Sequence, residues 1–213
     1  ERVSPLGIEA PAPTLPDVKE AFLSRYPQLQ NKRILLFLGR LHPKKGCDLL
    51  INALSRNPEG NVSLVLAGPD QIGWRRELEQ QSARLGMSSR IVFTGMLEGD
   101  MKWGALAAAD AFVLPSHQEN FGMSVIEALA VGLPVLISNR VNIWREIEND
   151  NAGYVESDDL AGTTRLIERW LNTPPQKWEA MRTKAQQSFL RRFEINHAVD
   201  SLLRILTEGR TTS

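Results

Sequence analysis

The sequence has very little cysteine and no excess of charge of either sign. Cys47 is the single cysteine among 213 residues, so an intramolecular disulfide is excluded and a reducing compartment is expected. A helix N-terminus can lower a thiol pKa, but no histidine partner is evident, and we expect Cys47 to be a small buried residue. The 25 basic and 25 acidic residues cancel, whereas a general nucleic-acid binder carries a basic excess.

Long apolar runs and metal-binding motifs are also lacking. Without an apolar run or a signal-peptide pattern, we expect no transmembrane helix and a cytoplasmic protein. There is no D-x-D, no H-x-x-x-H and no cysteine pair, so we expect no metal. His42, His117 and His197 are scattered. His117 lies near the expected site, where contact with substrate is the alternative to an ordinary loop histidine.

Short apolar strands alternate with helices along the chain, which predicts an α/β fold with a doubly wound, Rossmann-like parallel sheet. The expected strands are residues 33–38, 62–67, 90–93, 111–114, 134–137 and 153–155. The expected helices are residues 17–26, 47–56, 73–85, 101–109, 143–147, 159–171, 175–189 and 194–207, with one more beginning at Gly122. Ligand sites in such sheets lie beyond the carboxyl ends of the strands, so the loops after the first four strands are the expected site.

The segment P-S-H-Q-E-N-F-G-M-S-V-I-E-A-L-A-V, residues 115–131, predicts a loop and a helix after a buried strand. Glu119 lies in the loop, and Glu127 lies in the helix among apolar neighbours, where a carboxylate requires hydrogen-bond donors. The N–H groups of Phe121, Gly122 and Met123 open the helix without intrahelical partners and can bind a phosphate. A sugar nucleotide needs both an anion site and hydroxyl acceptors. The alternative is that Glu127 lies on a surface helix face.

The loop G-R-L-H-P-K-K-G, residues 39–46, places Arg40 and Lys45 after the first strand. It is neither a P-loop nor the dinucleotide fingerprint G-x-G-x-x-G. The glycines at its two ends let the backbone turn tightly and approach a ligand. The alternative is an ordinary basic surface loop, and Lys44 is expected to be solvated.

Together the two segments resemble retaining GT-B glycosyltransferases of the family-4-like, group 1 type. P-S-x-x-E-x-F-G-x-x-x-x-E-A-L-A-x-G-x-P-V matches their E-x7-E motif, and G-R-L-x-x-x-K-G matches their diphosphate loop. The resemblance runs from Val3 to about Ile205 and implies the C-terminal, donor-binding domain. Leu6 departs from the usual Asn of the linker V-x-P-N-G-V-D. Asn142 departs from the Gly of G-G-x-x-E-x-I, a segment for which we expect packing and loop support.

The resemblance implies a role for each matching residue. Arg40, Lys45 and Glu119 form the expected catalytic set, with the two cations on the donor diphosphate and Glu119 on the sugar hydroxyls. Glu127 is expected to bind the ribose hydroxyls. The N–H groups that open the helix are expected at the sugar and diphosphate, and the backbone after the third strand at the nucleobase. The whole expected donor-binding set is Arg40, Lys45, Gly95, Met96, Leu97, Glu119, Asn120, Phe121, Gly122, Met123 and Glu127.

The implied reaction moves a hexose from a nucleotide-diphosphate sugar to a hydroxyl acceptor with retained configuration, in polysaccharide or glycoconjugate synthesis and without a cofactor. UDP-hexose is favoured over GDP-mannose as the donor. Two alternatives stay open, a sugar-nucleotide epimerase and a non-catalytic nucleotide-sugar-binding module of the same fold.

The resemblance also implies a domain division. Residues 1–16 are expected to be an interdomain linker, 17–190 the donor-binding domain, and 191–213 a C-terminal helix and tail. An acceptor-binding domain is expected to precede Glu1 and to make any peripheral membrane contact. The isolated fragment is therefore expected to be inactive in transfer.

Overall fold

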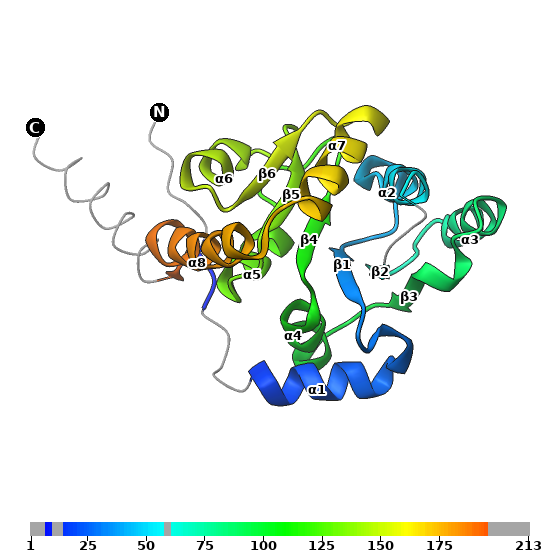
Figure 1. Ribbon diagram of the computed structural model, residues 1–213, viewed down its shortest axis with the longest axis horizontal. Helices are drawn as coiled ribbons and strands as arrows, with labels where there is room; N and C mark the ends of the chain where they lie inside the picture. The colour runs from blue at the N-terminus through cyan, green and yellow to red at the C-terminus, as the bar shows by residue number, and fades with distance from the viewer. Residues whose placement is uncertain (1–6, 10–14, 58–60, 196–213) are drawn as a thin grey trace, which may run out of the picture.

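The computed structural model describes residues 7–9, 15–57 and 61–195, and in them a parallel sheet lies between two layers of helices (Figure 1). The strands are β1 (Arg33–Leu38), β2 (Val62–Ala67), β3 (Ile91–Gly95), β4 (Ala111–Leu114), β5 (Val135–Ser138) and β6 (Gly153–Glu156). Their order across the sheet is β3-β2-β1-β4-β5-β6. This confirms the predicted doubly wound, Rossmann-like fold.

Helices cover both faces of the sheet. The α-helices are α1 (Leu15–Arg25), α2 (Cys47–Ser55), α3 (Arg75–Arg84), α4 (Gly99–Ala108), α5 (Met123–Ala130), α6 (Trp144–Asp150), α7 (Leu160–Leu171) and α8 (Pro175–Arg192). Short 3-10 turns are η1 (Pro27–Leu29), η2 (Pro43–Lys45) and η3 (Ser88–Arg90). In Figure 1, α2, α3 and α7 lie on one side of the row of strands, and α1, α4, α5, α6 and α8 lie on the other.

The strands are apolar along their whole length because both faces of the sheet are covered. Every residue of β2, β4 and β5 is buried. The largest fully buried side chains include Trp170 from α7, Phe22 from α1, Phe37 from β1 and Phe112 from β4. The core is therefore continuous from one helical layer through the sheet to the other.

The predicted bounds of β1, β2 and β4 are confirmed, while those of β3, β5 and β6 were wrong by one or more residues. Arg90 belongs to η3, and its guanidinium donates to the carbonyls of Val62 and Asn57, so β3 begins at Ile91. β3 runs on to Gly95, which still pairs with β2. β5 is shifted to Val135–Ser138 because proline has no backbone N–H to donate to a ladder.

The last described helix is tied to α6 by a buried carboxylate. Asp150, at the end of α6, accepts hydrogen bonds from Ser188 (2.6 Å), Arg191 and Arg192 (2.7 Å) of α8. Burial alone would raise the pKa of Asp150, but the hydrogen bonds from Arg192, Ser188 and Arg191 outweigh it and hold that pKa well below its usual range. α8 is therefore anchored up to Arg192.

Part of the sequence lies outside the described residues. This includes Leu6 and most of the helix expected at residues 194–207, so these expectations stay predictions, as does the division into linker, domain and tail. Among the helices that the structure describes, none is long and apolar enough to cross a membrane.

Candidate functional site

The site lies between β1 and β4, where the order in which successive strands are added to the sheet reverses. β1 pairs with β2 on one side and with β4 on the other, in register at Leu35 with Ala111 and Leu36 with Phe112. In a doubly wound sheet the loops at this switch point diverge and leave a crevice at the carboxyl ends of the strands. The loops after β1 and β4 are the two that carry the sequence motifs.

The two loops are in direct contact. The carbonyl oxygen of Lys44 accepts hydrogen bonds from the His117 N–H at 2.8 Å and from the Ser116 hydroxyl at 2.9 Å. Gly46 has a φ of 72°, and a Cβ built on it would lie 2.6 Å from the carbonyl oxygen of Pro115. Only glycine fits there, because the space is closed and the backbone is left-handed.

An ion pair joins two of the predicted donor-binding side chains, one from each loop. The Lys45 ammonium contacts a carboxylate oxygen of Glu119, with the two side chains 17% and 21% exposed. The Glu119 backbone is fixed as well, because its N–H donates to the Arg140 carbonyl and its own carbonyl accepts from Asn142, both at 3.1 Å. The segment after β5 therefore supports the Glu119 loop, as predicted.

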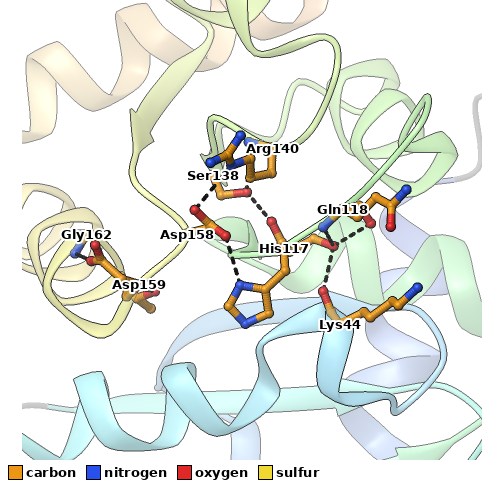
Figure 2. A network of polar contacts seen from close by, with 10 residues as sticks. Lys44, His117, Gln118, Ser138, Arg140, Asp158, Asp159 and Gly162 are labelled. Carbon is orange, nitrogen blue, oxygen red and sulfur yellow. Dashed lines mark hydrogen bonds and ion pairs between the residues drawn. The ribbon is translucent and has the colours of Figure 1, made fainter.

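A second network holds the outer side of that loop. Figure 2 shows Asp158, which follows β6, between His117 and Arg140. Its carboxylate lies 2.9 Å from His117 Nδ1 and 3.4 Å from Arg140 Nε. The hydrogen bond with His117 is the largest influence on Asp158 and lowers its pKa. His117 is therefore a loop histidine with a structural partner, and the motifs gave no indication of Asp158.

A cavity of about 420 Å³ opens beside the ion pair, and most of the predicted donor-binding set lines it. The predicted residues that it brings together are Arg40, Lys45, Glu119, Asn120, Phe121, Gly122, Met123 and Glu127. Leu38, Gly39, Leu114 and Ser124 line it too and were not predicted. A neighbouring hollow of about 340 Å³ shares Arg40, Lys45, Glu119 and Asn120 and adds His42, Lys44 and Gln118. Because the two hollows share these four residues, they are called the crevice below.

The N-terminus of α5 faces this crevice through backbone amides. Gly122 has a φ of 71° and its carbonyl accepts from the N–H groups of Val125 and Ile126. In the part of the chain that the structure describes, the N–H groups of residues 121–124 have no protein acceptor. These amides, the α5 dipole and the cations Arg40 and Lys45 can hold an anion.

Glu127 has a partner that the sequence did not indicate. Lys102, on α4, places its ammonium 2.7 Å from Glu127 Oε1, with side chains 24% and 17% exposed. No local pattern distinguishes Lys102 from a solvated helix residue. Arg40 is more exposed than Lys45, and the hydrogen bond that it makes within the described part of the chain is a long one, 3.4 Å to Gln71.

The three residues predicted at the nucleobase do not line the two hollows. Gly95 ends β3, and its carbonyl accepts from the Gly68 N–H at 2.8 Å. Met96 is 62% exposed and Leu97 is half-buried against the core. They follow the neighbouring strand on the same edge of the sheet, and their contact with a base stays a prediction.

Two other sequence expectations concern reactive side chains. Cys47, the first residue of α2, is fully buried, and that burial raises the pKa of its thiol, so it is the inert core residue that we expected. Among the described residues, no group of three or more His, Cys, Asp or Glu side chains is placed to hold a metal ion.

Residues 19–188 match the family described as glycosyl transferases group 1. The chain belongs to this family. An uncharacterised glycosyltransferase of Methanocaldococcus jannaschii is 33% identical over 146 residues, which are 66% of this chain and 37% of that protein. The D-inositol 3-phosphate glycosyltransferase of Rhodococcus jostii is 28% identical over 180 residues, 81% of this chain and 40% of that protein.

Solved glycosyltransferases share the fold of this group 1 chain. A glycosyltransferase of Rickettsia africae superposes with a TM-score of 0.87 at 20% identity, covering 100% of this chain and 58% of that one. Anabaena HepE in complex with UDP and glucose gives 0.81 at 24% identity, covering 94% and 55%. The chain thus spans about two fifths of the two curated relatives, at 37% and 40%, and just over half of these solved structures.

Proposed function

We propose that this domain binds the donor of a retaining glycosyltransferase, a nucleotide-diphosphate hexose. The observation that carries the proposal is the crevice in which Lys45, Glu119 and the α5 amides meet, with Glu127 on its wall. Cations and free N–H groups suit a diphosphate, and carboxylates suit the hydroxyls on either side of it. Membership of the glycosyl transferases group 1 family supports sugar transfer as the reaction.

Each group in the crevice has a part in the proposed reaction. Lys45, Arg40 and the α5 N-terminus stabilise the charge that develops on the departing diphosphate. Glu119 accepts hydrogen bonds from the donor sugar and so fixes its orientation for attack. Glu127 accepts from the ribose hydroxyls. Catalysis then comes from positioning and electrostatic stabilisation, with the acceptor hydroxyl attacking on the face from which the diphosphate leaves.

The proposed donor is UDP-hexose ahead of GDP-mannose. The complex of Anabaena HepE with UDP and glucose supports uridine, although that protein shares 24% identity with this chain. A role in polysaccharide or glycoconjugate synthesis is part of the same proposal. It is supported by relatives named as glycosyltransferases, among them the D-inositol 3-phosphate glycosyltransferase of Rhodococcus jostii.

We further propose that this domain does not bind the acceptor by itself. The described crevice contains groups suited to a diphosphate and hydroxyls, and the relatives are more than twice as long as the matched region, which is 37% of one and 40% of another. The purified chain is then expected to bind donor nucleotide and to transfer no sugar. Robust transfer to an added acceptor, with no other polypeptide present, would overturn this part of the proposal.

The test of donor binding is a calorimetric titration of the chain with UDP, GDP and their hexose conjugates. Glu127→Gln keeps the shape of the side chain and removes its charge, so nucleotide affinity should fall by about tenfold or more, as for a lost charge-assisted hydrogen bond. Circular dichroism checks that the variant is folded. Absence of binding to every nucleotide by the unmodified chain would exclude the proposed function. Turnover of a sugar nucleotide to an epimer would instead favour the epimerase alternative.

A further inference from the structure

We infer that Lys102 is a positioning residue for Glu127, and that through it Lys102 determines how strongly the site selects a ribose over a deoxyribose. The inference rests on the proposed function, because it assumes that Glu127 binds ribose hydroxyls. Its basis is the ion pair in which Lys102 Nζ lies 2.7 Å from Glu127 Oε1. Lys102 acts on the ligand through this carboxylate.

Lys102 is held on a firmly packed helix. α4 lies against α1, and Gly104 allows the two backbones to approach closely, since a Cβ on Gly104 would lie 2.2 Å from the carbonyl oxygen of Val18. The Lys102 ammonium also lies 4.9 Å from the centre of the Trp103 ring, a favourable cation–π distance. The ring and the carboxylate together limit the positions that the lysine can adopt.

The ion pair with Lys102 stabilises Glu127, whose neighbours on α5 are apolar. Val125, Ile126, Ala128 and Leu129 around it on α5 are buried, and its own side chain is 17% exposed. A half-buried carboxylate without a partner carries a desolvation cost and has several rotamers. Lys102 balances the charge and engages Oε1, while Oε2 has no hydrogen-bond donor among the described residues. Because Glu127 lines the cavity, the inference assigns Oε2 to the ligand.

The closing experiment compares ribose with deoxyribose ligands. UDP and 2′-deoxy-UDP, and in parallel GDP and 2′-deoxy-GDP, are titrated by calorimetry into the chain and into Lys102→Met, Lys102→Arg and Glu127→Gln. We expect the unmodified chain to prefer the ribose form by about tenfold, the size of one charge-assisted hydrogen bond. Lys102→Met should reduce that preference to nearly one while binding of the deoxy form changes little. Lys102→Arg, which retains the positive charge, should restore most of the preference.

Two controls separate positioning from damage to the fold. Lys177→Met makes the same substitution on α8, where the exposed Lys177 lies 6.0 Å from the Tyr154 ring, and it should leave the ratio unchanged. The double variant Lys102→Met with Glu127→Gln should show no further loss beyond Glu127→Gln, because Lys102 acts through that carboxylate.

The possible results lead to different conclusions. An unchanged ribose preference in Lys102→Met, or an equal loss for both sugars, overturns the positioning role and leaves donor binding intact. Failure of the unmodified chain to bind any of the four nucleotides overturns the proposed function and this inference with it.

Discussion

Lys45 and Glu119 form an ion pair although they lie 74 positions apart in the sequence. Each comes from a loop that leaves the sheet beside the other, and the cavity opens next to the pair. In the proposed reaction Lys45 faces the diphosphate and Glu119 faces the sugar, so in the free protein each offsets the charge of the other. This gives a specific expectation for the removal of either charge.

Glu119→Gln should have opposite effects on the binding of UDP and on the contribution of the hexose to the binding of UDP-hexose. With the negative charge gone, Lys45 is released toward the diphosphate, so UDP should bind more tightly by about 1 kcal/mol, roughly fivefold. The additional affinity that a hexose gives to UDP-hexose should decrease, because an acceptor for its hydroxyls is weakened. Calorimetric titration of both ligands measures this, and weaker binding of UDP alone would contradict it.

Lys45→Ala and Arg40→Ala should weaken UDP much more than uridine. The lost partner is a positive charge on phosphate, which contributes about 1.5–3 kcal/mol, or about 10- to 140-fold in affinity. Titration of nucleoside and nucleoside diphosphate against each variant gives the two losses. Lys177, which is exposed on α8 and does not line the crevice, provides the matched control Lys177→Ala, with a small effect expected. Equal losses for both ligands would indicate a disturbed loop instead.

Gly46→Ala should destabilise the protein by more than Gly86→Ala. Both glycines have left-handed backbones, with φ of 72° and 69°, but a Cβ at Gly86 would meet nothing within 4 Å. Gly86→Ala should therefore cost about 1–2 kcal/mol of unfolding free energy from backbone strain alone. Gly46→Ala adds the collision with the Pro115 carbonyl, for a total of about 2–5 kcal/mol. Urea unfolding compares them, and equal costs would show that the loops can separate freely.

Stability should depend on Asp150 at acid pH. Because its folded-state pKa is depressed, its contribution is complete above roughly pH 5 and is lost as the pH falls through the unfolded value of about 3.9 toward the folded one. Asp150→Asn leaves Arg191 and Arg192 without their charged partner and should cost about 3–5 kcal/mol at neutral pH. Urea unfolding from pH 7 to pH 3 should show the difference between the two proteins shrinking on acidification. A difference independent of pH would contradict the assignment.

The sequence predicts the sheet well because apolar runs covered on both faces have a clear pattern. The strand bounds of β1, β2 and β4 follow from the apolar runs alone. The loops that carry Arg40 and Glu119 can be recognised because glycine, proline and charged residues interrupt those runs. The bounds of β3 could not be predicted from composition, because Arg90 has side-chain contacts to a distant segment and Gly95 pairs despite lacking a side chain.

The sequence did not predict which charged side chains pair with one another. Lys102 with Glu127 joins two helices, and Asp158 with His117 joins two loops, and neither pair has a characteristic spacing. Such contacts depend on how the helices pack and on which loops are neighbours, so they follow only from the three-dimensional arrangement. The predicted donor-binding residues Arg40, Lys45 and Glu119 lie on loops that the structure brings together, and the structure shows the contacts that hold these loops.

The reaction of Cys47 with a thiol reagent can report local opening of the structure around the Lys45 loop. Cys47 directly follows Gly46 under the Lys45 loop, it is 0% exposed, and its burial raises the pKa of the thiol, so a thiol-specific reagent cannot reach it in the native state. Because it is the one cysteine of the sequence, the labelling rate reads a single position without any engineered probe. If a nucleotide binds at Lys45 and stabilises the closed loop, the labelling rate of Cys47 should fall as the bound fraction rises. The labelling rate would then measure ligand occupancy.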